Sequence, residues 1–279
     1  MAIAEREAHQ IEEANTSGRP AVVLIHGLWL LPSSWDRWAE LFAQAGYATV
    51  TASWPDDPET VEEARAKPNV FAGKTVGQVA AHVQELIAEL TGKRAVVGHS
   101  FGGLLAQIIA GHGLSAATVA IDPAPFRGVL PLPISSLRSA MPVLANPANR
   151  GRAVTLTPGQ FRYGWANAVS DEEAKRLYDT FHVPASGAPL FQAATANLNP
   201  RTEAKVDSRN SARGPLLLVS GGNDHTVPWA ITNASYKRQR RNDGITEIVE
   251  IPNRGHALTI DDGWREVAEA ALGFVKRFV

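Results

Sequence analysis

Six short apolar runs recur along the chain, and each is continuous rather than alternating with polar residues. They are Ala21–Ile25, Ala48–Ala52, Ala95–Val97, Ala117–Ile121, Leu216–Ser220 and Thr246–Ile251. Such continuity is typical of strands that are buried on both faces. Segments with helical periodicity lie between several of them, at residues 34–45, 76–90, 104–110 and 263–278. This alternation predicts an α/β fold with a mostly parallel, doubly wound sheet.

The alternation stops between Asp122 and Leu216. Six prolines interrupt residues 123–147, and helical patterns then follow without strands between them. One such helix is predicted to begin at Ser170, where Ser170-Asp-Glu-Glu173 has the form of a capping box. We therefore predict three parts: a polar N-terminal segment at residues 1–20, an α/β core at 21–122 and 208–279, and an inserted helical cap at 123–207.

The composition and net charge of the chain indicate which binding partners and which cellular compartment to expect. The 279 residues carry a net charge of −1, so no global field attracts nucleic acid, and we expect a small-molecule substrate instead. The absence of cysteine excludes disulfides and thiolate metal sites, and the histidines lack metal-ligand spacing, so no metal is expected. Neither a signal-peptide pattern in residues 1–20 nor an apolar run of about 18 residues is present. These features predict a soluble cytoplasmic protein without membrane insertion.

The most informative motif is Gly98-His99-Ser100-Phe101-Gly102, which follows an apolar run and leads into a helical pattern. A Gly-x-Ser-x-Gly sequence at a strand-to-helix turn is typical of a nucleophile elbow, in which the serine is strained and exposed. Gly98 and Gly102 then allow the strand and the helix to approach closely. The alternative is a glycine-rich turn in which Ser100 only caps the helix.

A nucleophilic serine needs a base to accept its proton and an acid to orient that base. Asp224 follows the apolar run Leu216–Ser220, and His256 follows Thr246–Ile251. The chain order of serine, acid and histidine is the one expected for this kind of elbow. Asp122, which ends an earlier apolar run, is the alternative acid.

Catalysis at a carbonyl also requires two donors for the oxyanion that develops. The backbone N–H of Phe101 follows the nucleophile, and the loop His26-Gly27-Leu28-Trp29 after the first strand can supply the N–H of Leu28. His26 is expected to hold loops together rather than to transfer protons.

Aromatic and aliphatic residues near the elbow and in the cap predict an apolar pocket. The predicted lining residues are Trp29, Phe126, Leu130, Phe161 and Trp165. Their three-dimensional arrangement, and hence the identity of the substrate, cannot be derived from spacing.

Together these motifs resemble the α/β-hydrolase fold family over residues 21–122 and 208–279, and in particular its small serine esterases with a His-Gly oxyanion motif. The resemblance implies an acyl-enzyme mechanism without a cofactor and a helical cap over the pocket. Members of the family usually have eight strands that begin with an antiparallel pair. Residues 1–20 show no such pair, so a smaller sheet is expected.

The resulting hypothesis is a serine hydrolase that cleaves a carboxylic ester of a small, largely apolar substrate. The same residues would also serve a thioesterase, lactonase, amidase or carbon–carbon bond hydrolase, because oxyanion stabilisation is common to all of them. Relatives that cleave carbon–halogen bonds or epoxides carry aspartate at the nucleophile position, and Ser100 argues against both chemistries. A third hypothesis is a non-catalytic receptor that retains the fold for small-molecule binding.

Overall fold

The main sheet has six strands, all parallel, in the computed structural model, which describes residues 3–279. Met1 and Ala2 of the predicted N-terminal segment lie outside the described residues. The strand order is β2-β1-β3-β4-β7-β8. The strands are β1 (Ala21–Ile25), β2 (Ala48–Ala52), β3 (Arg94–His99), β4 (Ala117–Ile121), β7 (Leu216–Gly221) and β8 (Thr246–Ile251). The predicted doubly wound parallel sheet is therefore confirmed.

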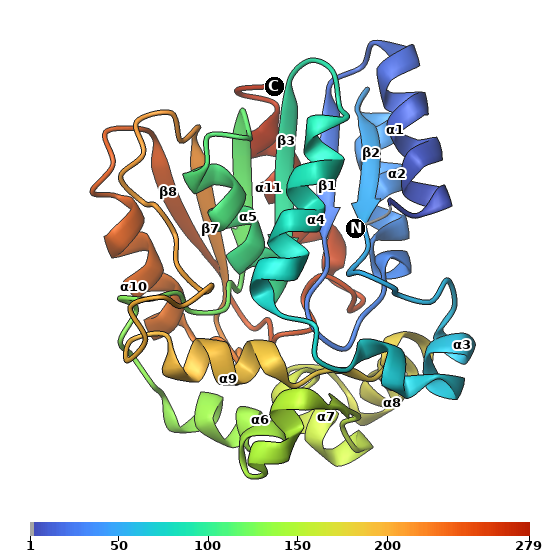
Figure 1. Ribbon diagram of the computed structural model, residues 1–279, viewed down its shortest axis with the longest axis vertical. Helices are drawn as coiled ribbons and strands as arrows, with labels where there is room; N and C mark the ends of the chain where they lie inside the picture. The colour runs from blue at the N-terminus through green and yellow to red at the C-terminus, as the bar shows by residue number, and fades with distance from the viewer. Residues whose placement is uncertain (1–2) are drawn as a thin grey trace.

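Helices cover both faces of this sheet (Figure 1). Alternate strand residues point to opposite faces. Val23 and its register partner Val96 join a buried cluster with α1, α4 and α5. Leu24 and its partner Val97 join a second cluster with α2 and α11. Because both faces are buried, the strands read as continuous apolar runs in the sequence.

The core helices include the four predicted periodic segments, with shifted ends, and three further helices that lie outside those segments. They are α1 (Glu5–Ser17), α2 (Asp36–Gln44), α3 (Val61–Ala66), α4 (Val76–Ala88), α5 (Phe101–Gly111), α10 (Trp229–Gln239) and α11 (Trp264–Val275), with 3-10 turns at Pro32–Trp35 and Pro68–Phe71. Within residues 3–279, no helix has the length and apolar character needed to cross a membrane.

Between β4 and β7 the chain leaves the sheet and forms the region that we call the cap, residues 123–207. It contains α6 (Ile134–Leu144), α7 (Pro158–Gly164), α8 (Asp171–Phe181), α9 (Ala188–Thr195), a 3-10 turn (Pro147–Gly151) and an antiparallel pair, β5 (Ala153–Val154) and β6 (Ala185–Ser186). Ser170 caps α8 by accepting from the N–H of Glu173, as the sequence predicts. In Figure 1 these helices lie beyond the end of the sheet to which the strand arrows point.

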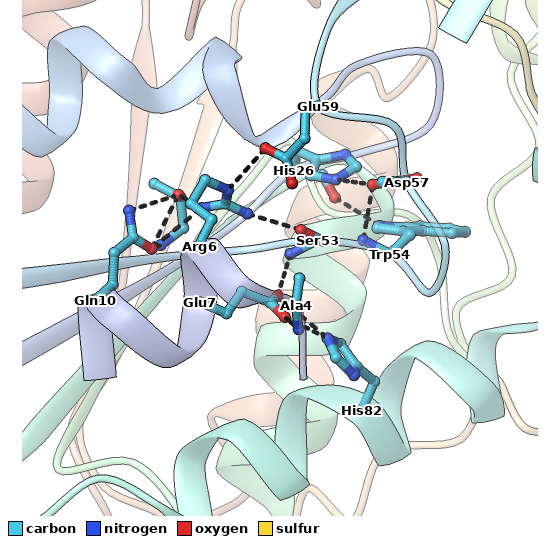
Figure 2. A network of polar contacts seen from close by, with 11 residues as sticks. Ala4, Arg6, Glu7, Gln10, His26, Ser53, Trp54, Asp57, Glu59 and His82 are labelled. Carbon is cyan, nitrogen blue, oxygen red and sulfur yellow. Dashed lines mark hydrogen bonds and ion pairs between the residues drawn. The ribbon is translucent and has the colours of Figure 1, made fainter. Parts of the chain in front are cut away.

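The N-terminal segment forms a helix rather than the strand pair usual in the family. Helix α1 lies beside β2 at one edge of the sheet and buries Glu7, Ile11 and Ala14 (Figure 1). The buried Glu7 carboxylate accepts from the N–H of Ser53 at 2.7 Å and lies 3.2 Å from the His82 ring (Figure 2). A single buried charge, satisfied by hydrogen bonds, thus ties α1 to β2 and α4.

The tightest packing in the core lies where β1, β3 and α5 meet. A Cβ on Gly98 would lie 2.0 Å from the carbonyl oxygen of Gly102, and a Cβ on Gly102 would lie 2.0 Å from that of Ile25. Neither backbone can move without displacing a central strand. Glycine is therefore required at both positions by space.

We expect Gly102→Ala to lower the free energy of unfolding by more than about 4 kcal/mol, because overpacking against backbone cannot be relieved by a rotamer change. Gly273→Ala in α11 is the matched control, since a Cβ at that position would meet no neighbouring segment within 4 Å. That change should stabilise the helix by about 0.5–1 kcal/mol. Urea unfolding of both variants measures the difference, and similar stabilities would contradict this account.

The Glu7 carboxylate should make stability depend on pH. Burial alone would raise its pKa, but hydrogen bonds from His82, Ser53 and Ala4 hold the pKa of Glu7 below its ordinary value. A carboxyl whose pKa is lowered on folding stabilises the protein above its unfolded pKa of about 4.3, and this contribution is lost as pH falls through the folded value.

Glu7→Gln should therefore cost roughly 2–3 kcal/mol at pH 7, and the difference from wild type should shrink below about pH 4. Denaturant unfolding between pH 7 and pH 3 measures it. Glu12→Gln, on the exposed face of the same helix, should change stability by less than about 0.5 kcal/mol. A Glu7→Gln deficit that stays constant over this pH range would disprove the assigned role of the charge.

Candidate active site

Ser100 occupies a strained turn between β3 and α5. Its backbone has φ 57° and ψ −119°, a conformation that residues other than glycine rarely adopt. The turn is held by the N–H of Ser100, which donates to the carbonyl of Ile121 at 2.9 Å. The side chain reaches a cavity at the carboxyl end of the sheet. The site thus lies beside the point where the strand order reverses between β1 and β3, which is where open parallel sheets bind ligands.

His256 and Asp224 lie on loops at the same edge of the sheet and form a continuous hydrogen-bonded row with Ser100. The Nε2 atom of His256 is 3.0 Å from Ser100 Oγ, and its Nδ1 atom is 2.6 Å from Asp224 Oδ2. A carboxylate only accepts, so Nδ1 carries the proton and Nε2 is free to accept from the serine hydroxyl. All three side chains are buried from bulk solvent.

The Asp224 carboxylate accepts three hydrogen bonds, one of them from His256. Its Oδ1 atom accepts from the N–H groups of Thr226 at 2.6 Å and Val227 at 2.9 Å. Burial opposes ionisation, but the neighbouring His256 holds the pKa of Asp224 below its ordinary value. Asp224 is therefore ionised at neutral pH.

Asp122, the alternative acid, lies beside Asp224 but makes a different set of contacts. Its Oδ1 atom accepts from the N–H of Gly221 at 2.8 Å, while Oδ2 has no hydrogen-bond partner within the part of the chain that the structure describes. Burial and the adjacent Asp224 carboxylate raise the pKa of Asp122 well above its usual range. Two neighbouring carboxyls resist ionising together, and Asp122 is the one that ionises with more difficulty.

Aromatic rings enclose His256 from behind. The ring of His99 is 4.7 Å from that of His256, and Trp165 of the cap packs edge-on against His256, also at 4.7 Å. Neither nitrogen of His99 has a protein partner among residues 3–279, and burial lowers its pKa well below the ordinary value. His99 is thus a neutral packing ring that faces His256.

The only grouping of potential metal ligands found among the described residues is His99, Asp122 and His256, whose donor atoms lie within 4.8 Å of one another. Both ring nitrogens of His256 are already engaged by Ser100 and Asp224. His256 therefore has no ring nitrogen left for a metal ion while these two contacts are made.

Of the two backbone N–H groups predicted as oxyanion donors, that of Phe101 directly follows Ser100, and that of Leu28 belongs to the residue after Gly27, which packs against Ser100. Phe101 is the first residue of α5, so its N–H has no acceptor one turn earlier within the helix. Leu28 follows Gly27, which lies directly against Ser100: a Cβ on Gly27 would be 2.8 Å from the Cβ of Ser100. The loop after β1 and the start of α5 therefore meet at the serine.

The cavity at Ser100 has a volume of about 190 Å³ and is lined by uncharged residues throughout the described chain. Of the predicted pocket residues, Trp29 and Leu130 line it, whereas Phe126, Phe161 and Trp165 do not. All three of these aromatic side chains are buried elsewhere: Phe161 stacks on Trp165 at 5.8 Å, Trp165 packs against His256, and Phe126 belongs to the main core cluster. Spacing alone could not reveal which side of a cap helix faces the core.

Most of the wall comes from residues that sequence reasoning missed. They include Val129, Leu137, Leu144, Leu190, Val227 and Ile231. The helical periodicity of α6 identifies an apolar stripe, but the cavity depends on how that stripe is placed over the loops of the core.

Solved structures share this fold at low sequence identity. The chain is similar to a monoacylglycerol lipase of Paleococcus ferrophilus, at 20% identity over 92% of this chain and 95% of that one, with a TM-score of 0.64. It is also similar to an extracellular alpha/beta-hydrolase of a Paenibacillus species, at 20% identity, 91% and 98% coverage and a TM-score of 0.67. A thioesterase domain from the curacin biosynthetic pathway aligns at 17% identity, covering 92% of each chain, with a TM-score of 0.58.

No curated protein shows significant sequence similarity to this chain. A family-level comparison is more decisive, because the sequence profile of the alpha/beta hydrolase family matches residues 22–270, from the first strand to within the last helix. The match spans both halves of the sheet, the cap between them, and each of the three residues of the hydrogen-bonded row. The chain belongs to the alpha/beta hydrolase family.

Proposed function

We propose that this protein is a serine hydrolase that cleaves carboxylic esters of small, largely apolar molecules. The observation that carries the proposal is the row Ser100–His256–Asp224, with contacts of 3.0 and 2.6 Å, at the wall of an uncharged cavity. A strained serine hydroxyl bonded to an oriented, neutral imidazole is the arrangement that acyl transfer requires.

In the proposed mechanism, Ser100 Oγ attacks the ester carbonyl while His256 Nε2 accepts its proton. The Asp224 carboxylate stabilises the imidazolium, and the N–H groups of Leu28 and Phe101 hold the oxyanion. His256 then protonates the departing alcohol, which leaves an acyl group on Ser100. A water molecule, deprotonated by His256, releases the acid and restores the serine. This series of steps uses no cofactor.

The cavity supports an apolar substrate. Its rim carries the exposed side chains of Leu130 and Leu132, both 71% exposed, and the polar lining groups are neutral hydroxyls and one amide. An acidic substrate or a carrier rich in phosphates would find no cation on this wall within the described residues. This favours an ester with an apolar acyl group over an acyl-CoA.

Similar structures include a monoacylglycerol lipase, two lipolytic enzymes described with lipase and esterase families, and a pyrethroid hydrolase. Since their identity to this chain is about 20% or lower, they support the fold, and the choice of bond rests on the cavity.

Ser100→Ala should lower kcat for short p-nitrophenyl esters by at least about 10⁴-fold, because the nucleophile is lost. Ser33→Ala is the matched control, an exposed serine outside the cavity, and should leave the rate unchanged. Labelling with a fluorophosphonate probe should occur in wild type and be absent from Ser100→Ala. Equal ester turnover by wild type and Ser100→Ala would refute the proposal, and tight ligand binding without turnover would favour the receptor.

The two buried aspartates should respond differently to amide substitution. Asp224→Asn should lower kcat about 10⁴-fold, because an amide no longer favours the productive tautomer of His256. Asp122→Asn should stay within about tenfold of wild type, since His256 Nδ1 contacts Asp224 instead and the Oδ1 contact of Asp122 to Gly221 survives in asparagine. Steady-state kinetics on folded variants distinguishes them, and the reverse order would identify Asp122 as the acid.

A further inference from the structure

A second buried histidine–carboxylate pair lies behind the loop that carries Leu28. His26 follows β1, and its Nε2 atom is 3.0 Å from Asp57 Oδ2, with both side chains no more than 3% exposed (Figure 2). Its other ring nitrogen, Nδ1, is 2.8 Å from the carbonyl oxygen of Gly27. Asp57 belongs to the loop after β2, so this pair joins the ends of two adjacent strands.

The hydrogen-bond partners determine where the protons are. The Gly27 carbonyl can only accept, so His26 Nδ1 must donate to it. Asp57 Oδ2 also accepts from the N–H of Trp54 at 2.8 Å, and one further proton lies between this oxygen and His26 Nε2. With this proton shared between them, His26 Nε2 and Asp57 Oδ2 each have a hydrogen-bond partner, and the ring is fixed. Asp57 thereby keeps the ring oriented with Nδ1–H on the Gly27 carbonyl.

The contact at Gly27 bears directly on Leu28. The carbonyl of Gly27 and the N–H of Leu28 belong to one peptide unit, and in a trans peptide these two groups point in opposite directions. Holding the carbonyl toward His26 turns the N–H of Leu28 to the opposite side. Gly27 itself lies against Ser100, so the orientation of this peptide unit is fixed next to the serine.

We propose that His26, oriented by Asp57, is a positioning residue that holds the Gly27–Leu28 peptide so that the Leu28 N–H faces the oxyanion. Its kinetic consequence rests on the proposed function, whereas the orientation of the peptide can be tested without turnover. His26 touches no reacting atom and acts through the backbone alone.

Three further hydrogen bonds hold the loops around His26 in place. Trp54 Nε1 donates to the carbonyl of His26 at 3.3 Å, and on the cap side Trp29 Nε1 donates to the carbonyl of Val154 at 3.0 Å. Behind Trp54, Arg6 of α1 donates to Ser53 Oγ at 2.7 Å (Figure 2). The N-terminal helix is thus connected to the predicted oxyanion loop through the loop that follows β2.

Two substitutions of His26 separate its contact to the Gly27 carbonyl from its contact to Asp57. Asparagine places its amide nitrogen near the position of Nδ1, so His26→Asn retains a donor for the Gly27 carbonyl. Glutamine extends toward the position of Nε2, so His26→Gln retains the contact to Asp57 and loses that donor. We expect His26→Gln to lower kcat for p-nitrophenyl esters about 10²-fold with KM nearly unchanged, as for loss of one oxyanion donor, and His26→Asn to lose less than about tenfold.

His82→Gln is the matched control. His82 belongs to another buried histidine–carboxylate pair, with Glu7 at 3.2 Å, and its ring makes no contact with Gly27. This variant should lower the melting temperature while leaving kcat within about twofold of wild type. If His26→Asn and His26→Gln lose the same activity in proportion to their melting temperatures, the role of His26 is only structural and the proposal fails.

Crystal structures of the two His26 variants provide a test that does not depend on turnover. The Gly27–Leu28 peptide should keep its orientation in His26→Asn and rotate in His26→Gln. An unrotated peptide in His26→Gln would overturn the proposal even if every esterase assay succeeds, and a rotated one would support it even if the wild type cleaves no ester.

Nitrogen NMR of the wild-type protein covers the case in which a variant does not fold. With ¹⁵N-labelled histidine, the Nδ1 signal of His26 should lie in the protonated range and couple to the carbonyl carbon of Gly27. An unprotonated Nδ1 at neutral pH would overturn the proposal.

Discussion

The close approach of three backbones around Ser100 is the constraint on which the rest of the structure depends. Strand β3 turns directly into α5, and the helix rests against the carbonyl of Ile25 at the end of β1, with distances that only glycine at positions 98 and 102 permits. The strain in the backbone of Ser100 is maintained by this packing. The other groups of the site are arranged around a serine whose backbone position is fixed by this packing.

Burial of charge imposes the second constraint. Asp122, Asp224 and His256 lie together away from solvent, where uncompensated charges are costly. The structure satisfies them by concentrating donors on Asp224, whereas Asp122 keeps one oxygen without a partner among the described residues. A raised pKa for Asp122 and a lowered pKa for Asp224 are two consequences of one arrangement. The order of ionisation follows from the groups beside each carboxyl, because His256 favours the charged form of Asp224 and the adjacent Asp224 disfavours the charged form of Asp122.

The cap lines the cavity at Ser100 and also contacts the loops that carry Asp224 and His256. Ala257, next to His256, donates its N–H to the carbonyl of Trp165, and the Asn167 amide donates to the carbonyl of Asn223 beside Asp224. The loops that carry Asp224 and His256 are therefore both attached to the residues that follow α7. A change in the cap that serves substrate choice will also affect the geometry of the hydrogen-bonded row.

The sequence alone determined the sheet, because continuous apolar runs report strands buried on both faces, and it indicated the elbow and the loops that carry Asp224 and His256. These are local patterns: a Gly-x-Ser-x-Gly turn, and polar residues where strands end. Only the tertiary structure decided which aspartate contacts His256, because Asp122 and Asp224 both follow strands at the same edge. It also decided that Phe161 and Trp165 pack within the cap, that residues 5–17 form a helix, and that His26 contacts Asp57. Each of these depends on distances between segments far apart in the chain, which local periodicity does not encode.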